Sequence, residues 1–320
     1  MTVLRLATRR SALALAQARF IADHLTAHTG HRVDLVPVVT HGDRDRGSLA
    51  QIGGTGVFVA AVRAAVVAGR ADLAVHSLKD LPTAPDPLLA QIAIPQREDP
   101  RDALVSRTRA SLAELPPGSR VGTGSPRRRA QLAALRPDLQ VVDIRGNVDS
   151  RLARVAGNPD DVGDQGLDAV VLAVAGLARL AKRETICEYL DTEFMVPAPG
   201  QGALAVEVRA DLVCAQPGQN ALTDALRALD DQRTRAAVTA ERSLLAALEA
   251  GCSAPVGALA QVAEGSESNL HLRAVVARAD GSLVRASIAG PAGEAEQIGR
   301  RLADDLLAEL APAVRGGRST

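Results

Sequence analysis

The sequence predicts an α/β protein with two lobes built on mainly parallel sheets, followed by a smaller C-terminal α+β domain. Its 320 residues exceed what one hydrophobic core normally organises, which indicates two or three domains. Strand-like apolar runs alternate with helical patterns through short connections, as in parallel sheets covered by helices. Two segments rich in proline with charge or glycine, 95–102 and 196–203, interrupt this alternation and indicate crossings between the lobes.

The first lobe is expected to span residues 1–96 and to be completed by about 202–222. Its long polar stretch Thr40–Gly54 predicts a lid or a disordered loop. Ser11 is a suitable N-cap and Gly69 a suitable C-cap for its two helices. The expected strands are Val3–Ala7, Val33–Val39, Ala71–Val75, Leu88–Ile94 and the returning Leu204–Val208, and the expected helices run from Ser11 to about His28 and over Phe58–Ala68.

The second lobe, residues 97–201, repeats the alternation, whereas the C-terminal domain, residues 223–320, departs from it. The second lobe is expected to contain strands Arg120-Val121, Gln140–Ile144 and Asp168–Ala173, with helices over Ser125–Leu135, from Asn147 to about Ala156, and over Ala175–Ala181. Beyond the linker Gln216–Gln219 we expect helices Leu222–Leu229 and Arg233–Glu249, strands Val256–Val262, Leu270–Ala277 and Leu283–Ile288 with a hairpin turn at Asp280-Gly281, and a final helix Ala295–Leu310.

Composition narrows the function classes. Lys+Arg and Asp+Glu both number 37, so the chain carries no net charge and is not expected to bind nucleic acid. Apolar runs near the N-terminus are short and interrupted by arginines, which predicts neither a secretion signal nor a membrane span. The three cysteines form no CxxC pair, so we expect no disulfide framework, no metal site and a reducing, cytoplasmic location.

The stretch from Val121 to Leu132 predicts a strand, a tight glycine turn and a helix start. Ser125 suits the N-cap and Pro126 the first helical position. Arg127 and Arg128 then lie on the first turn, where the helix dipole disfavours cations, so they indicate a bound anion. The alternative is a solvated basic turn, because arginine is common throughout this chain.

Comparable turns recur, at Arg9 with Ser11, at Ser77 to Lys79, and at Arg145-Gly146-Asn147. If these turns converge, several charge-assisted hydrogen bonds together could hold a ligand with many carboxylates or phosphates. A phosphate loop is not indicated, because Gly53-Gly54-Thr55-Gly56 lacks the lysine and spacing of that motif.

Two further positions carry reactive groups. Lys79 and Asp80 follow the carboxyl end of a strand, where open parallel sheets bind ligands, although an exposed, salt-bridged turn is the alternative. Cys252 lies between Gly251 and Ser253 in an expected loop, but a lone cysteine is more often a small buried hydrophobe than a nucleophile.

Taken together, the motifs resemble one family, the porphobilinogen deaminases (hydroxymethylbilane synthases), from Leu4 to about Leu310. The motifs that carry the resemblance are Ala7-Thr8-Arg9 with Ser11, Ala74 to Pro82, Arg97 to Ala103, Arg145-Gly146-Asn147 with Arg151, Leu172 to Leu177, Pro199 to Ala203, and Ala240-Glu241-Arg242 leading to Gly251-Cys252. The lobes are accordingly expected to resemble those of periplasmic binding proteins.

The resemblance implies an enzyme of tetrapyrrole and heme biosynthesis. Four porphobilinogen molecules would be joined head to tail into hydroxymethylbilane, with release of ammonia at each step. A dipyrromethane cofactor made from substrate would be joined to Cys252 by a thioether. The enzyme would be a cytoplasmic monomer whose partner is its small-molecule substrate, with no nucleic-acid or membrane partner.

The resemblance also implies roles for single residues. Asp80 would be the catalytic carboxylate that stabilises the cation left by loss of ammonia and moves protons. The cofactor would contact Cys252, Ser77, Lys79, Asp80, Thr123, Ser125, Arg127, Arg128, Arg145 and Gly146, and the substrate would contact Arg9, Ser11, Arg145, Arg151 and Arg179.

The chain departs from the family pattern at a few positions. Gln51 and Thr55 stand where lysines are frequent, which weakens the case that the Thr40–Gly54 loop binds carboxylates directly. Ala12, Gly124 and Pro126 also differ from the commoner residues. The rival interpretation is a non-catalytic two-lobed binder of carboxylates, and a phosphate-binding transferase would need a nucleotide motif that we do not find.

Overall fold

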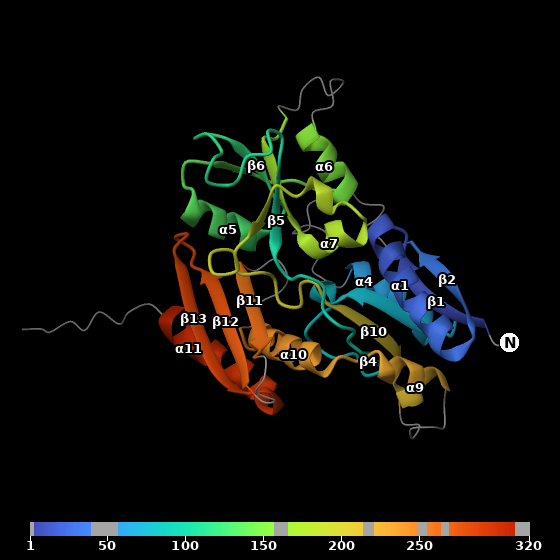
Figure 1. Cartoon of the computed structure of the whole chain (residues 1–320). Helices are drawn as coiled ribbons and strands as arrows, with labels where there is room; N and C mark the ends of the chain where they lie inside the picture. Colours follow the sequence, from blue (N-terminus) through green and yellow to red (C-terminus); the bar gives the residue numbers. More distant parts are fainter. Residues whose placement is uncertain are drawn as a thin grey trace, which may run out of the picture.

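The computed structural model describes residues 3–39, 57–156, 166–213, 221–248, 255–263 and 269–310. The predicted loop Thr40–Gly54, the linker Gln216–Gln219, and Cys214 and Cys252 lie outside the described residues. Figure 1 shows three parts: a first lobe that is mostly blue to cyan, a second lobe that is mostly green, and a C-terminal domain in orange and red.

The first lobe is a five-stranded sheet in the order β2-β1-β3-β10-β4. β1 is parallel to β2 and β3, whereas β10 is antiparallel to β3 and β4. The predicted return of a late strand to this lobe is therefore confirmed, and that strand alone runs against the others. The bounds are β1 Val3–Arg9, β2 Arg32–Val38, β3 Leu73–Ser77, β4 Leu89–Ala93, β10 Leu204–Arg209, α1 Ala12–Thr29, α4 Val57–Val67, η1 Leu78–Asp80, α8 Ala210–Val213 and α9 Ala221–Ala228.

The second lobe repeats this arrangement in the order β7-β6-β8-β5-β9. β6, β7 and β8 are parallel, and β5 is antiparallel to β8 and β9. In each lobe the reversed strand directly follows a crossing from the other lobe, and the predicted mainly parallel fold class is confirmed. The bounds are β5 Asp102–Ser106, β6 Arg120–Gly122, β7 Gln140–Val142, β8 Ala169–Ala173, β9 Glu188–Leu190, α5 Pro126–Leu135, α6 Val148–Ala156, α7 Val174–Arg179 and η2 Arg183–Thr185.

Local sequence explains where the site-bearing helices begin. The Ser11 hydroxyl accepts a hydrogen bond from Ala14 N at the start of α1, and the Ser125 hydroxyl accepts one from Arg128 N at the start of α5. Pro126 occupies the first turn of α5. Both predicted N-caps are confirmed.

The C-terminal domain is a three-stranded antiparallel sheet, β11-β12-β13, covered by two helices (Figure 1). A Cβ at Gly299 would lie 2.3 Å from Ala240 O, so glycine allows α10 and α11 to pack closely. The bounds are α10 Gln232–Ala247, β11 Val256–Val262, β12 Asn269–Ala277, β13 Leu283–Pro291, η3 Ala292–Glu294 and α11 Ala295–Leu310.

Helix α9 belongs to the core of the first lobe. Its Ala225 and Leu226, with Leu229, pack in one cluster with Leu6, Ile21 and other residues of β1 and α1. The core of this lobe therefore extends beyond residue 222, whereas the sequence predicted that the C-terminal domain begins at 223. The amphipathic pattern of α9 could not reveal which sheet its apolar face would cover.

The buried Glu241 of α10 joins the C-terminal domain to both crossings. Its carboxylate accepts hydrogen bonds from Arg97 Nη1 at 2.6 Å, from Gly200 N at 2.6 Å and from Ala260 N at 2.8 Å. A buried carboxylate is tolerated because it is paired and hydrogen-bonded. The three parts of the molecule therefore meet where the crossings lie.

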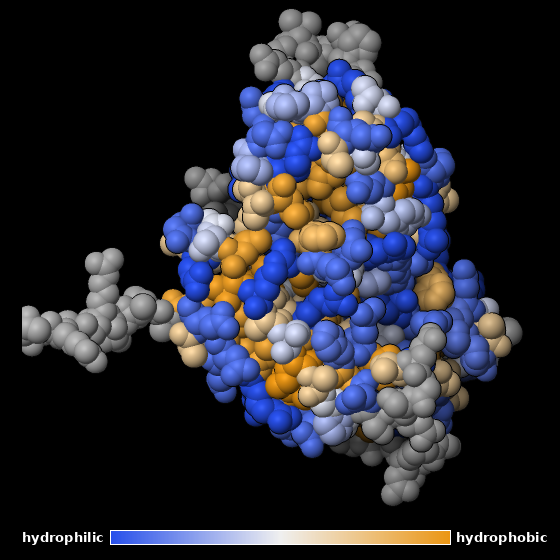
Figure 2. Space-filling model, turned by 60° about the vertical axis from the view of Figure 1, so that its left-hand side comes forward, coloured by the Kyte–Doolittle hydropathy of each residue, from blue (hydrophilic) through white to orange (hydrophobic). Residues whose placement is uncertain are grey.

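The surface carries both hydrophobic and hydrophilic residues. Figure 2 shows hydrophobic residues in several places among hydrophilic ones on the side that bears the C-terminal domain. Within the described residues, none of the helices combines the length and the apolar character that crossing a bilayer requires.

Candidate functional site

The carboxyl edge of the first sheet brings the ends of β1 and β3 together, because these strands are parallel neighbours. The Ser77 hydroxyl at the end of β3 accepts a hydrogen bond of 2.9 Å from Gln17 Nε2 of α1. The 3-10 turn η1 follows directly. Lys79 on this turn is half-buried and Asp80 is exposed.

The corresponding edge of the second sheet carries the other predicted turns. Thr123 after β6 is buried, and its hydroxyl accepts a hydrogen bond of 3.2 Å from Ser125 N. A Cβ at Gly124 would lie 2.5 Å from Ile144 O, so glycine lets the turns after β6 and β7 approach closely. Arg145 and Gly146 follow β7 and are exposed, and Gly146 adopts a φ of 102°.

Arg127 and Arg128 of α5 are buried rather than solvated, with exposed fractions of 3% and 5%. Both bind the fully buried Asp102 of β5: Arg127 Nη2 lies 2.8 Å from Oδ2 and Arg128 Nη2 lies 2.7 Å from Oδ1. Burial by itself raises the pKa of Asp102, but the two guanidiniums hold it well below its usual value. The sequence predicts that these arginines face a ligand anion; in the structure each is paired with a carboxylate of its own chain.

Gln201 in the second crossing connects this buried cluster to Lys79. Its Nε2 donates to Asp102 Oδ1 at 2.8 Å, and its Oε1 accepts from Lys79 Nζ at 3.4 Å. Lys79 belongs to the first lobe and Asp102 to the second. One amide side chain therefore joins the two sheet edges.

Positive charge is concentrated around this junction. Burial lowers the pKa of Lys79 to about 8, with Asp80 opposing this shift and Arg128 adding to it. Burial also lowers the pKa of Arg151, and neighbouring Arg128 and Arg145 add to that effect. Like charges thus lie close enough to destabilise one another, which is the condition that a bound anion relieves.

The two edges come together through helix α1. A Cβ on Gly176 of α7 would lie 3.7 Å from Leu13 and 3.8 Å from Val148, so the first turn of α1 reaches the starts of α6 and α7. Ser11 at the N-cap of α1, and the preceding Arg9, therefore lie beside the second lobe.

Arg179 of α7 contacts the crossings instead. Its Nη2 donates to Gly202 O at 2.6 Å. Burial lowers the pKa of Arg179 to about 10, an effect that Glu98 opposes. Its position fits a hinge contact as well as the substrate contact that the resemblance implies.

The donors gathered here suit an acidic ligand such as the implied cofactor. Among the described residues, Arg127 Nε and Arg151 Nε are buried without a hydrogen-bond partner. Each guanidinium carries five N–H groups, and the bonds to Asp102, Val196 O and Val171 O use only part of them. Cys252, the predicted attachment point, lies outside the described residues. Among those that are described, no group of three or more His, Cys, Asp or Glu residues could hold a metal ion.

Sequence reasoning did not identify Asp102 or Gln201 as parts of this site. The sequence placed Asp102 only in the charged crossing 95–102 and Gln201 only in the motif Pro199 to Ala203. One signal was present for Asp102, an acidic residue immediately before the apolar run Ala103-Leu104-Val105. A carboxylate at the first position of a buried strand requires a cationic partner.

Comparison with solved structures finds distant likenesses. A periplasmic substrate-binding protein of an ABC transporter from Coxiella burnetii aligns with a TM-score of 0.42 and 13% identity, over 71% of this chain and 91% of that chain. Immunogenic lipoprotein A from Vibrio vulnificus aligns with a TM-score of 0.40 and 12% identity, over 72% of this chain and 96% of that chain.

Comparison of sequences gives much stronger likenesses. The chain is 51% identical to porphobilinogen deaminase 1 of Streptomyces coelicolor, over 99% of this chain and 98% of the relative. It is 50% identical to porphobilinogen deaminase of Thermobifida fusca, over 98% of this chain and 96% of the relative. These matches do not favour the rival interpretation of a non-catalytic carboxylate binder.

Two family models match the chain. Residues 4–215 match the model described as "Porphobilinogen deaminase, dipyromethane cofactor binding domain". Residues 235–308 match the C-terminal domain of the same family. The resemblance predicted from the motifs is thereby confirmed, and this chain belongs to the porphobilinogen deaminase family.

Proposed function

We propose that the junction of the two sheet edges, from Lys79 and Asp80 to Arg127, Arg128 and Arg151, is the active site of this deaminase. The enzyme joins four porphobilinogen molecules head to tail into hydroxymethylbilane and releases ammonia at each step. The observation that carries the assignment of the site is that Gln201 links Lys79 of the first lobe to Asp102, which pairs with Arg127 and Arg128 of the second.

Asp80 acts as the catalytic carboxylate. Departure of ammonia leaves a positively charged carbon on the incoming pyrrole, and a nearby carboxylate stabilises that charge. The same oxygen atoms can take up and return the protons of the pyrrole ring. The exposure of Asp80 on η1 supports this role, because its carboxylate is accessible to a ligand.

The cationic and hydroxyl side chains bind the acetate and propionate groups of the rings. Lys79, Arg127, Arg128 and Arg151 surround one region, and Thr123 and Ser125 lie beside it on the turn that starts α5. Ser77, Arg145 and Gly146 complete the cofactor contacts that we assign, and Arg9, Ser11, Arg145, Arg151 and Arg179 contact substrate rings.

The dipyrromethane cofactor, when bound, supplies the primer to which the first substrate ring is joined. We assign its thioether to Cys252. Lys79, Arg127 and Arg128 would hold its carboxylates, while Gln201 keeps Lys79 close to the buried Asp102. These contacts come from both lobes, so the primer would be held from two sides.

Intact-mass spectrometry tests the cofactor assignment. The wild-type protein should carry a mass excess of two pyrrole units, and Cys252→Ser should carry none. Cys187→Ser is the matched control and should keep the excess. A fully active wild-type protein of unmodified mass would refute the assignment.

Turnover of Asp80→Asn tests the catalytic assignment. The variant should keep the covalent mass excess and lose most of its turnover, by about 100-fold or more, because a neutral amide neither stabilises the cation nor accepts a proton. Asp86→Asn, which removes a carboxylate that caps Leu88 N in the same connection, should remain active. Near-normal product formation by Asp80→Asn would remove Asp80 from the mechanism.

We further propose that the enzyme works as a cytoplasmic monomer without a nucleic-acid or membrane partner. The zero net charge supports the absence of nucleic acid. Light scattering coupled to size-exclusion chromatography should give the mass of one chain, and a dimer mass at micromolar concentration would contradict the proposal.

A further inference from the structure

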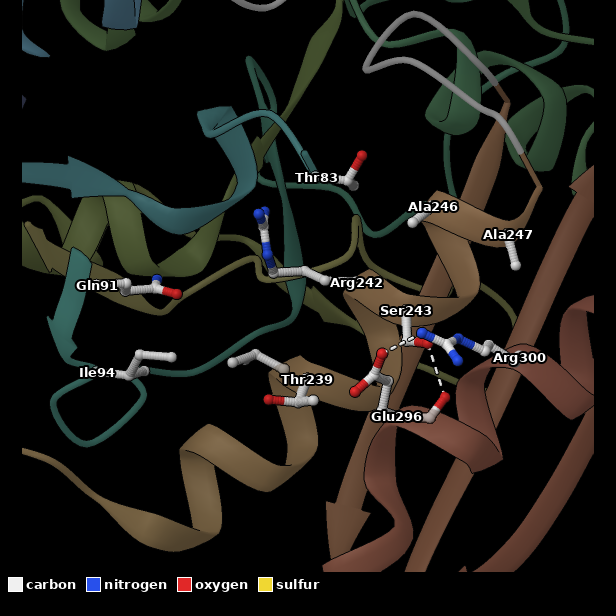
Figure 3. Close-up of a pocket in the computed structure, with 11 residues that line it drawn as sticks. Thr83, Gln91, Ile94, Thr239, Arg242, Ser243, Ala246, Ala247, Glu296 and Arg300 are labelled. Atoms are coloured by element: carbon white, nitrogen blue, oxygen red, sulfur yellow. Dashed lines mark hydrogen bonds and ion pairs between the residues drawn. The ribbon is translucent and has the colours of Figure 1, made fainter. Parts of the chain in front are cut away.

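Arg242 extends from α10 of the C-terminal domain to the turn that carries Asp80. Its Nη1 donates to Leu81 O at 3.1 Å and to Leu78 O at 3.4 Å, and its Nη2 donates to Pro82 O at 2.5 Å. In Figure 3 the guanidinium points away from Ser243. One side chain therefore binds backbone carbonyls on both sides of Asp80.

The turn itself has little regular structure to hold it. η1 spans three residues, and Leu81 N donates to Leu78 O at 3.1 Å within it. Such short 3-10 turns have poor hydrogen-bond geometry and depend on their surroundings. Leu78 N is fixed by Ala203 O at 3.0 Å, which orients the start of the turn.

The side chains beneath the turn fix its depth. Leu78 and Leu81 are buried in one cluster with Val238 of α10. Apolar packing is not directional, so it holds the turn against α10 without fixing the rotation of its peptide planes. The planar guanidinium of Arg242 supplies that direction through its fork of N–H groups.

We propose that Arg242 is a positioning residue for the condensation reaction, which holds the Asp80 turn at the orientation that turnover requires. This inference rests on the catalytic role proposed for Asp80. The residues assigned to substrate rings, such as Arg151 of α6 and Arg179 of α7, lie on other elements than this turn. Loss of Arg242 should therefore lower kcat and leave KM nearly unchanged.

A groove beside Arg242 makes the proposal testable by chemical rescue. The groove has a volume of about 430 Å³, and Figure 3 shows Arg242 and Thr239 of α10, Gln91 of β4 and Thr83 around it. Removing the Arg242 side chain would enlarge this open space. A small guanidinium ion could then enter and donate to the same carbonyls.

The first variant is Arg242→Ala, measured in the cofactor-loaded enzyme. We expect kcat to fall by about 10- to 100-fold with KM within about twofold, since small misplacement of a catalytic group is costly. Amide hydrogen exchange should accelerate in the peptide covering residues 78–83. Methylguanidine should restore part of the lost kcat and slow that exchange again.

Arg235→Ala is the matched control. Arg235 also lies on α10 and also reaches the first lobe, because its Nη2 donates to Ile92 O at 3.3 Å and pairs with Asp230. Among the described residues, none of the hydrogen bonds of Arg235 reaches a backbone carbonyl of residues 78–82. This variant should keep kcat and the exchange rate of the 78–83 peptide, and methylguanidine should not affect it.

Unchanged kcat and exchange in Arg242→Ala would overturn the proposal, as would an equal loss in Arg235→Ala or a raised KM with unchanged kcat. Should Arg242→Ala not fold, Arg242→Lys is used, which keeps the charge but not the planar fork. A folded Arg242→Lys with wild-type kcat and exchange would equally overturn it. If Asp80→Asn is inactive while Arg242→Ala is normal, this inference alone fails; if Asp80→Asn is active, the catalytic assignment fails.

Discussion

Asp102 Oδ1 accepts hydrogen bonds from both Nε and Nη2 of Arg128, at 3.1 and 2.7 Å, and both side chains are buried. The pair joins β5, which follows the first crossing, to α5, which carries the anion-binding turn. The charges of these two buried side chains are thus paired within the chain itself.

Asp102→Ala is expected to destabilise the protein by about 3–5 kcal/mol, because it leaves two buried guanidiniums without their counter-charge. The measurement is the free energy of unfolding in urea for the wild type and the variant. Asp99→Ala, three residues earlier and paired with the more exposed Arg101, should cost only about 0–1 kcal/mol. Equal losses in the two variants would show that Asp102 is not the special partner of Arg127 and Arg128.

Lys79 predicts a pH dependence of cofactor loading. With a pKa of about 8 in the ligand-free protein, its ammonium is charged below that pH and neutral above it. Binding of a carboxylate needs the charged form, so capture of the cofactor by the apoprotein should weaken as pH rises through about 8. Because the Cys252 thiolate becomes more abundant over the same range, the loading of wild type is compared with that of Lys79→Arg.

Arginine stays protonated throughout this range, so the ratio of wild-type to Lys79→Arg loading should fall between about pH 7 and about pH 10. Intact-mass spectrometry gives the loaded fraction at each pH. Lys182, the other lysine, pairs with Asp149 at 2.9 Å and provides the control Lys182→Arg, whose ratio to wild type should stay constant. A constant ratio for Lys79→Arg would exclude Lys79 as the titrating group.

The buried Glu207 is expected to make the folded protein less stable in acid. Its carboxylate binds Arg63 Nη2 at 2.6 Å and lies 3.2 Å from His76 Nε2. Burial alone would raise its pKa, but hydrogen bonds from His76 and Arg63 lower the pKa to about 2. A carboxyl group with a lowered folded-state pKa stabilises the protein above its unfolded-state pKa, and this stabilisation disappears as pH falls through the folded-state pKa.

The stabilising contribution of Glu207 should therefore be complete above about pH 5 and decline toward about pH 2, by about 3 kcal/mol in total. The measurement is the difference in unfolding free energy between wild type and Glu207→Gln over that range. Asp34→Asn, which removes the exposed partner of Arg32, should show no measurable change in its difference from wild type. A Glu207→Gln difference that is independent of pH would contradict the assignment.

Replacing Gly202 by alanine is expected to disturb the backbone at the second crossing. Its φ is 90°, and a Cβ there would lie 2.3 Å from Glu98 O. Gly281 has a similar φ of 85° in the hairpin turn, with no atom within 4 Å of an added Cβ. Comparing alanine at the two positions therefore separates the strain of the left-handed backbone from the clash.

Gly281→Ala should cost about 1–2 kcal/mol from backbone strain alone, and Gly202→Ala about 1–3 kcal/mol more. Thermal unfolding of both variants measures the difference. Equal losses would mean that the crossing can move away from Glu98 at no cost.

Features set by neighbouring residues were the ones that the sequence could predict. Ser11 and Ser125 could be assigned as N-caps from the sequence, since a serine hydroxyl at this position binds an amide only three residues further along the chain. The strands β5 and β9 were not among the expected strands. Their length does not explain this, since β6 and β7 are as short as β9 and were expected. The assignment of α9 to the first lobe depended on which sheet its apolar face met, which no local pattern records.

The candidate site shows the same division. The motif around Lys79 and Asp80, the arginine turn and Cys252 could be recognised from residue order, since each is a continuous stretch. The pairing of Asp102 with Arg127 and Arg128, and the reach of Arg242 to Leu81, join residues far apart in the chain. These contacts could not be read from residue order.

The sequence by itself determined the family, the alternation of strands and helices, and the chemical types of the groups that bind an acidic ligand. The tertiary structure decided which of those groups are paired internally and which remain available, because buried charges must find partners wherever the packing of the lobes places them. Local order encodes what each residue can do, and packing selects the partners with which it does so.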